Sequence, residues 1–256
     1  MNLNQIAHVI AAKKGGIGKT LSASFLTQYF RQSGIAIDAV DADPQAPKLS
    51  LIKALNAPLL PLIEHGEIKQ SAFDPTFSHI IKSKNATLID TGSGAFLPIL
   101  KYMRDNQLFD LLQQVKKQLY FHVIVISGPE KMNTAQGAGE LLEKTKGTGT
   151  KVVIWQNERN GIPLFDGKGM EETDWYLDNR DQIAGIVKIM DYNNSAYAED
   201  FLTMMEQNLT YQEIMDSKSK SFDFMRQNRI NRIFTDVYSE LDKIFKPQTQ
   251  LQNHKG

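Results

Sequence analysis

Cysteine is absent from all 256 residues, which excludes disulfides, thiol catalysis and cysteine-held metal or iron–sulfur clusters. The five histidines, at positions 8, 65, 79, 122 and 254, lie far apart and lack the ligand spacing of a zinc site. No apolar run approaches the ~20 residues that a membrane span needs. The N-terminus also lacks a basic segment followed by an apolar one. The sequence therefore predicts a cytoplasmic protein with no stable membrane insertion.

Excess charge of one sign is also missing. Lys and Arg together number 29, as do Asp and Glu, so the net charge is +0. Bulk electrostatics then favours neither nucleic acid nor membrane, and any such partner must be met by a local patch. The length suits one domain, which we expect over residues 1–246 with a helical C-terminal part at about 196–246. Residues 247–256 are polar and predicted to form a flexible tail.

Short apolar runs alternate with longer segments of helical periodicity. The expected strands are residues 6–11, 35–40, 86–89, 120–126, 152–155 and 183–189. The expected helices include residues 20–33, 96–117, 134–145 and about 221–245. Continuous apolar strands between helices predict an α/β fold, with a mostly parallel sheet flanked by helices on both faces in three layers. Ligands of such sheets bind beyond the carboxyl ends of the strands.

The loop after the first expected strand reads AKKGGIGKT over residues 12–20. Gly15, Gly16 and Gly18 allow the backbone to curl so that successive N–H groups point inward, at the positive end of the next helix. Lys19 is expected to reach the β- and γ-phosphates of a nucleotide, and the Thr20 hydroxyl to bind Mg²⁺. The alternative is an ordinary glycine-rich turn between a strand and a helix.

The segment KGGIGKT, residues 14–20, resembles the deviant Walker A motif of the ParA/MinD family of P-loop ATPases. The resemblance implies a P-loop NTPase fold with ATP and Mg²⁺ as cofactors, and a homodimer in the ATP-bound state. In the family the early lysine, here Lys14, crosses the dimer interface to touch the phosphates bound to the other subunit. Lys13 has no such role and is expected to be a solvated or phosphate-screening side chain. The cofactor-binding residues predicted here are Gly15, Gly16, Ile17, Gly18, Lys19, Thr20 and Leu21.

Two acidic segments resemble the switch regions of that family. DADPQ, residues 41–45, resembles switch I, which implies that Asp43 orients the attacking water and that Asp41 belongs to the Mg²⁺ shell. Asp90 ends an apolar run, as in a Walker B strand that holds Mg²⁺ through water. The family often has proline two residues later, where this chain has Gly92. The predicted metal-binding residues are Thr20, Asp41 and Asp90, and the predicted catalytic residues are Lys14, Lys19 and Asp43. The alternative for the first segment is a solvated turn.

Asn157 ends another expected strand, at the place where the family commonly has an asparagine that binds the adenine edge. The alternative for Asn157 is a turn former. No N-K-x-D element of the GTPase kind is present, which favours ATP over GTP. Further along, residues 157–158, 166–168, 179–181 and 183–186 resemble conjugative-transfer ATPases of the TraL type, which accompany mobile plasmids and integrative elements. The alternative is a plasmid-partition or positioning ATPase, and either reading implies a partner protein from such a system.

The last expected helix carries one apolar stripe, which predicts packing on the sheet. Arg226, Arg229 and Arg232 recur at three-residue spacing beside this stripe. They are candidates for nonspecific contact with DNA phosphates, and the alternative is a solvated helix face.

The sequence thus predicts a nucleotide-controlled dimerising switch with slow, partner-stimulated ATP hydrolysis. One alternative is a nucleotide-binding scaffold of a transfer assembly with negligible hydrolysis. The other is a ligase of small acids, which Lys14 disfavours.

Overall fold

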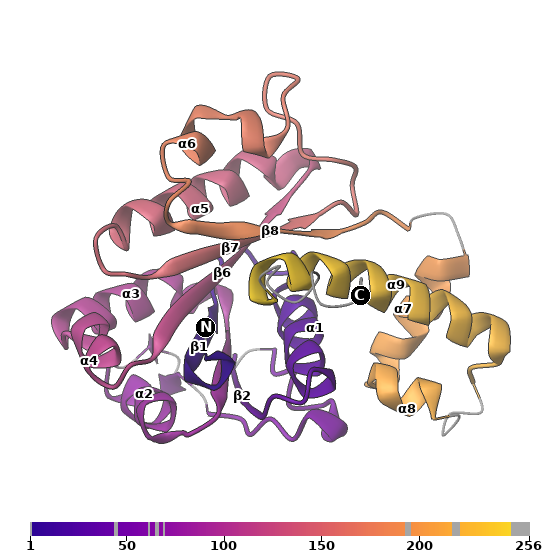
Figure 1. Cartoon of the computed structure of the whole chain (residues 1–256), viewed down its shortest axis with the longest axis horizontal. Helices are drawn as coiled ribbons and strands as arrows, with labels where there is room; N and C mark the ends of the chain where they lie inside the picture. The colour runs from indigo at the N-terminus through magenta and orange to yellow at the C-terminus, as the bar shows by residue number, and fades with distance from the viewer. Residues whose placement is uncertain are drawn as a thin grey trace, which may run out of the picture.

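One sheet of parallel strands organises the computed structural model, which describes residues 2–43, 46–60, 62–64, 67–68, 70–192, 196–216 and 221–246 (Figure 1). Its strands are β1 (Ile6–Ile10), β2 (Ile37–Ala42), β5 (Ala86–Thr91), β6 (Gln118–Ile126), β7 (Lys151–Asn157) and β8 (Ile183–Ile189). They lie in the order β2-β5-β1-β6-β7-β8, and every pair is parallel. A separate antiparallel pair joins β3 (Ile63–Glu64) to β4 (Glu67–Ile68).

Helices cover both faces of this sheet, and each face has its own apolar cluster. The first cluster includes residues of α1 (Lys19–Gln32), α7 (Ala196–Glu206), α8 (Tyr211–Met215) and α9 (Phe224–Phe245). The second includes residues of α2 (Phe73–Lys82), α3 (Phe96–Asp105), α4 (Leu108–Gln114) and α5 (Lys131–Lys144). Short α6 (Asp174–Leu177) lies in the connection from β7 to β8. The prediction of a three-layer α/β fold with a parallel sheet is therefore confirmed.

Strand β1 lies at the centre of the sheet because its side chains can be buried on both faces. All five of its residues are buried, as expected for a continuous apolar run in a sheet covered on both sides. β5 pairs with one edge of β1 and β6 with the other. The chain that leaves β1 therefore emerges at the switch point of the sheet, where ligands of α/β proteins bind.

Several element boundaries differ from those that the sequence predicts. Strand β2 continues to Ala42, so Asp41 is a strand residue and not a loop residue. The expected helix over residues 96–117 is wrong: it is two helices, α3 and α4, separated at Gln107. Gln107 has a positive φ of 52°, a left-handed conformation that ends a right-handed helix. The predicted tail at 247–256 and residues 44–45 of the DADPQ segment lie outside the described residues.

A chain of three buried aromatic side chains crosses the sheet on the face of α1 and α9. The Trp155 indole donates to Nδ1 of His122 at 3.0 Å, and His122 Nε2 lies 2.9 Å from Nδ1 of His8. Because His122 Nδ1 accepts a hydrogen bond, a neutral His122 carries its proton on Nε2. Through this N–H group His122 donates a hydrogen bond to Nδ1 of His8. Both imidazoles are fully buried, and burial lowers the pKa of His8 well below its usual value and that of His122 to about 3.

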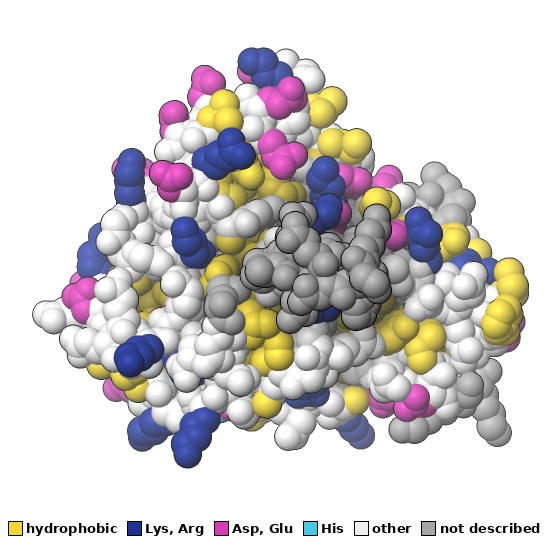
Figure 2. All heavy atoms as spheres, viewed as in Figure 1, with side chains coloured by type: hydrophobic (Ala, Val, Ile, Leu, Met, Phe, Trp, Pro, Cys, Tyr) yellow, Lys and Arg dark blue, Asp and Glu magenta, His cyan; other side chains and the backbone are white. Residues whose placement is uncertain are grey.

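The face of the molecule seen in Figure 2 shows Lys and Arg side chains scattered among acidic ones and not gathered in one patch. Hydrophobic side chains gather at its right-hand edge, over the end of α9 farthest from the sheet. Phe224 and Met225, the first residues of α9, are 79% and 56% exposed. Within the described residues, none of the helices has the length and apolarity to span a bilayer.

We expect the unfolding free energy to fall as the pH drops below about 6.5, because the unfolded chain binds protons on two imidazoles that stay neutral in the folded core. The loss should reach roughly 1 kcal/mol per pH unit for each histidine until the folded pKa is reached. Urea unfolding between neutral pH and about pH 5 measures the slope, and ¹H–¹⁵N spectra of the imidazoles report their protonation. If the folded protein carried a charged His8 or His122 at about pH 5, this account of the core would be wrong.

Candidate nucleotide-binding site

The loop between β1 and α1 has a backbone shape that depends on glycine. Gly16 and Gly18 have φ values of 75° and 110°, in the region that side chains with a Cβ rarely adopt. Gly18 is the N-cap of α1, and no side chain caps the helix there. The first N–H groups of α1 therefore have no side-chain acceptor at the N-cap, and the positive end of the helix faces the loop. This arrangement suits a phosphate group.

Lys19 is the first residue of α1 and is only 7% exposed. Its ammonium group donates to the backbone oxygen of Lys14 at 3.1 Å, across the loop. Burial lowers the pKa of Lys19 below its usual value, while the nearby carboxylates of Asp90 and Asp43 act in the opposite direction. The Lys19 ammonium group, close to these carboxylates and at the N-terminus of α1, can therefore bind a polyanion through charge-assisted hydrogen bonds.

Asp41 and Asp90 lie directly opposite each other on the adjacent strands β2 and β5. Both are buried, at 0% and 1% exposure. The Asp41 oxygens are well supported, because Oδ1 accepts from the Asp43 amide at 3.1 Å and Oδ2 from the Ser50 amide at 2.9 Å. The prediction from sequence missed this role of Asp41, which is to hold the loop that follows β2.

The Asp90 carboxylate lacks such support. Neither of its oxygens has a hydrogen-bond partner of normal geometry within the described residues. Burial is the main cause that raises the pKa of Asp90 to about 7, and Asp41 and Asp43 add to the increase. The Thr20 hydroxyl and Lys19 act to lower it. An ionised Asp90 would thus need a further positive charge to be stable at this place.

These residues fit a Mg²⁺ ion that is held partly by other ligands. In the described part of the chain, no group of three or more His, Asp or Glu residues could hold a metal by itself. Mg²⁺ usually keeps several waters and is bound by one or two carboxylates together with substrate phosphates. The unsupported Asp90 carboxylate, next to the Thr20 hydroxyl and the loop, provides that donor set.

Two more predicted site residues lie close to the same loop. Asp43 follows β2, is half-buried, and accepts from the Ala46 amide at 3.1 Å. Asn157 ends β7, and its amide nitrogen donates to the backbone oxygen of Ile17 at 3.0 Å. Asn157 therefore supports the loop from the neighbouring strand end. Its predicted contact with adenine stays a prediction, and the contact with Ile17 is a structural role that the sequence pattern did not indicate.

The two exposed lysines at the start of the loop are both paired with acidic residues near α5. Lys14 Nζ lies 2.9 Å from Glu130, which ends the 3-10 helix Gly128–Glu130 before α5. Lys13 pairs with Glu140 of α5, and its Nζ lies 5.8 Å from the centroid of the Phe96 ring. Lys13, expected from the sequence to be solvated or to screen phosphate, is thus held in an ion pair within its own chain.

Glu130 and Glu140 were missed by the sequence prediction. They lie more than a hundred residues from the lysines, and no local motif marks them. The only available signal was the position of Glu130 just after an apolar strand, since parallel strands bring their carboxyl ends together. A cavity of about 270 Å³ separates the loop from α5 and is lined by Ala12, Lys13, Lys14, Ile17, Phe96, Glu130, Asn133 and Gln136 among others.

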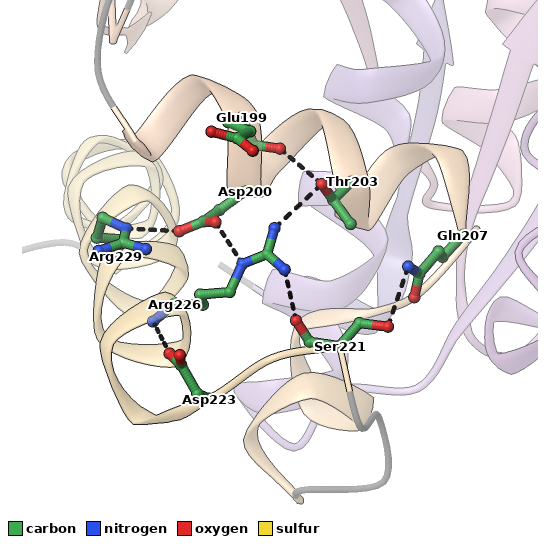
Figure 3. A network of polar contacts seen from close by, with 8 residues as sticks. All are labelled: Glu199, Asp200, Thr203, Gln207, Ser221, Asp223, Arg226 and Arg229. Carbon is green, nitrogen blue, oxygen red and sulfur yellow. Dashed lines mark hydrogen bonds and ion pairs between the residues drawn. The ribbon is translucent and has the colours of Figure 1, made fainter.

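The three arginines of α9 do not join this site. Figure 3 shows that Arg226 and Arg229 converge on Asp200 of α7, with Nε to carboxylate distances of 2.6 and 2.5 Å. Arg226 also donates to the Ser221 backbone oxygen and to the Thr203 hydroxyl. Asp200 is 2% exposed, so these contacts fasten α7 to α9. Arg232 pairs with Asp236 on its own helix at 3.1 Å.

Comparisons with known proteins agree with this site. Residues 8–225 match a family model described as the CobQ/CobB/MinD/ParA nucleotide binding domain. Two proteins of Escherichia coli, both named Protein TraL, are 27% and 26% identical to the chain over 235 residues. Each of these alignments covers 92% of this chain and 96% of the relative.

A solved structure supports the fold alone. The ParA family ATPase from Chlorobium tepidum superposes with a TM-score of 0.52 at 12% identity. The superposition covers 94% of this chain and 100% of that one.

The two opposed carboxylates should respond to removal of charge with opposite signs. Asp90 has a folded pKa raised to about 7, so the unfolding free energy of the protein falls as the pH rises from about 4 to 7 and the buried carboxyl group has to ionise. At pH 8, without nucleotide or metal, Asp90→Asn should therefore raise the unfolding free energy by roughly 1–3 kcal/mol. Asp41→Asn should lower it by roughly 1–3 kcal/mol, because one of two buried amide donors loses its acceptor.

Urea unfolding of the two variants at pH 8 measures both effects against the unmodified protein. The Asp41 variant is the matched control, since it removes the same charge from the opposite position on the neighbouring strand. A loss of stability in Asp90→Asn as large as that in Asp41→Asn would contradict our description of Asp90 as unsupported.

Proposed function

This chain belongs to the CobQ/CobB/MinD/ParA nucleotide-binding domain family, and from that premise we propose that it is a Mg·ATP-dependent switch that dimerises and hydrolyses ATP slowly. The observation that carries the proposal is the buried cluster at the carboxyl end of the sheet. There Lys19 and the unsupported Asp90 lie beside a glycine loop and the N-terminus of α1. In this proposal the phosphates of a nucleoside triphosphate provide the negative charge for Lys19, and Mg²⁺ provides the positive charge for Asp90.

Each residue of the cluster has a separate part in this proposal. The loop N–H groups and Lys19 bind the phosphates, and Thr20 and Asp90 hold the metal, with Asp41 in the shell around it. Mg²⁺ neutralises phosphate charge when bound. Asp43 accepts a hydrogen bond from a water and orients it for attack on the terminal phosphate. Positioning and charge neutralisation then provide the rate, as in other phosphoryl transfers.

The dimer is the second part of the proposal, and Lys14 is its contact residue. Lys14 is 52% exposed and is paired with Glu130 of its own chain. An ion pair this exposed stabilises the fold little, so a triphosphate on a second copy can compete for the lysine. Exposed apolar side chains follow strands β5, β6 and β7 at the same end of the sheet, namely Leu97, Met132 and Ile162, at 46%, 65% and 58% exposure. They offer apolar surface for the second copy.

The cellular setting is proposed from likeness to the two TraL proteins. We place the switch in conjugative DNA transfer or plasmid partition, with a partner protein that responds to the ATP-bound dimer. Direct DNA contact by Arg226, Arg229 and Arg232 is not part of the proposal. Arg226 and Arg229 are both engaged by the buried Asp200, and Arg232 is paired with Asp236, so these contacts reduce the charge that the three residues could offer to DNA phosphates.

Lys14→Ala should lose ATP-dependent dimerisation while it still binds nucleotide, because only the contact across the interface is removed. Sedimentation with ATP or ADP and Mg²⁺ measures the oligomeric state, and a fluorescent nucleotide measures binding. We expect a nucleotide affinity within about threefold of the unmodified protein, or less than about 1 kcal/mol. The matched control is Lys101→Ala, since Lys101 is also an exposed lysine in an ion pair, on α3.

The variant Glu130→Gln separates the lysine's role at the interface from its ion pair within the chain. It should still dimerise with ATP, since Lys14 is intact. The dimer proposal fails if Lys14→Ala dimerises as the unmodified protein does, or if the unmodified protein has the same oligomeric state with ADP and with ATP.

Asp43→Ala should lower phosphate release at least about tenfold and leave nucleotide affinity within about threefold. The physical reason is that a water-orienting carboxylate acts on the transition state and not on bound ATP. The measurement is phosphate release with saturating Mg·ATP, alone and with DNA. If the unmodified protein and the variant both release phosphate at the rate of the buffer, the chain is a nucleotide-binding scaffold, which is the alternative that the sequence left open.

A further inference from the structure

Gly92 lies directly against the carboxylate of Asp43. A Cβ atom built on Gly92 would be 2.9 Å from Asp43 Oδ1 and 3.1 Å from its Cγ. The first of these distances is shorter than real Cβ atoms show. Any residue other than glycine at this position therefore requires the Asp43 carboxylate to move.

The backbone at this position does not itself require glycine. Gly92 has φ −65° and ψ 157°, an extended conformation that every residue adopts. The preceding Thr91 hydroxyl donates to the Ile10 backbone oxygen of β1 at 2.7 Å, and the Gly92 oxygen accepts from the Ala95 amide at 3.1 Å. These contacts fix the backbone on both sides. What distinguishes glycine here is the absence of a side chain.

Asp43 is also held from the opposite side. Its Oδ1 accepts from the Ala46 amide, and its own amide donates to the buried Asp41 carboxylate at 3.1 Å. Asp41 in turn accepts from Ser50. The carboxylate thus lies in a narrow space between the loop after β2 and the Gly92 backbone, close enough to Lys19 and Asp90 to influence the pKa of both.

We propose that Gly92 is a positioning residue that sets where the Asp43 carboxylate lies and thereby sets the rate of hydrolysis. The inference rests on the proposed ATPase function, since Asp43 matters for rate only if it orients water. The atoms nearest to a methyl group at residue 92 belong to the Asp43 carboxylate, so the methyl group moves that carboxylate without changing the glycine loop between β1 and α1 or Lys19. Because catalysis depends on the placement of reacting groups to within about an ångström, this displacement reduces the rate and leaves binding intact.

The experiment compares Gly92→Ala with the unmodified protein in phosphate release and in binding of a fluorescent ATP analogue. We expect release to fall at least about tenfold, with nucleotide affinity within about twofold. Gly139→Ala is the matched control, because a Cβ at Gly139 on α5 meets no atom within 4 Å beyond the adjoining backbone of its own helix. It should hydrolyse ATP as the unmodified protein does.

The Asp43→Ala background tests whether Gly92 acts through Asp43. In that background Gly92→Ala should have no further effect on phosphate release, since the displaced carboxylate is already gone. The inference is overturned if Gly92→Ala alone hydrolyses within about twofold of the unmodified protein. An equal decrease in both backgrounds, or a loss of nucleotide binding in Gly92→Ala, also overturns it.

Failure of the proposed function gives a different result. If the unmodified protein itself does not hydrolyse ATP, the ATPase proposal fails, and crystal structures of the nucleotide-free unmodified and Gly92→Ala proteins decide the positioning claim. A displaced Asp43 carboxylate with an unchanged loop supports it. An unmoved carboxylate overturns it.

Discussion

Burial of like charges at one end of the sheet is the constraint on which this structure depends. The parallel arrangement places Asp41 and Asp90 opposite each other, where neither is accessible to water. The fold resolves the conflict differently for each: two backbone amides donate to the Asp41 carboxylate, while the Asp90 carboxylate has no hydrogen bond of normal geometry from the part of the chain that the structure describes. Such an arrangement costs stability in the free protein. It also makes this place electrostatically more favourable for a cation than a neutral pocket would be.

The same constraint explains the surroundings of the site. Lys19 reaches across the loop to a backbone oxygen, and Asn157 reaches in from β7 to another. The loop is therefore held in place by side chains that belong to different strands and helices. A preformed loop does not need to be ordered when nucleotide binds, which reduces the entropic cost of binding.

Sequence patterns could predict those parts of the site whose chemistry is local. The glycines, Lys19 and Thr20 are adjacent in the chain, and each acidic residue follows an apolar run that had to be a strand. Contacts between distant segments could not be predicted this way, and these include the pairing of Lys14 with Glu130 and the approach of Gly92 to Asp43. The arginines of α9 show the same limit, since their spacing was visible but their common partner Asp200 lies on another helix. The predicted helix over residues 96–117 was wrong because Gln107 adopts a left-handed conformation, which its residue type does not indicate.

The hydrogen bond from Lys19 to the peptide oxygen of Lys14 connects the two lysines mechanically. A polyanion that attracts the Lys19 ammonium group removes this hydrogen bond from the Lys14 oxygen. The peptide plane between residues 14 and 15 is then free to rotate, and Gly15, which has no Cβ, offers little resistance. If the protein forms the proposed dimer, a ligand bound at Lys19 would in this way alter the backbone next to Lys14 before a second subunit is present.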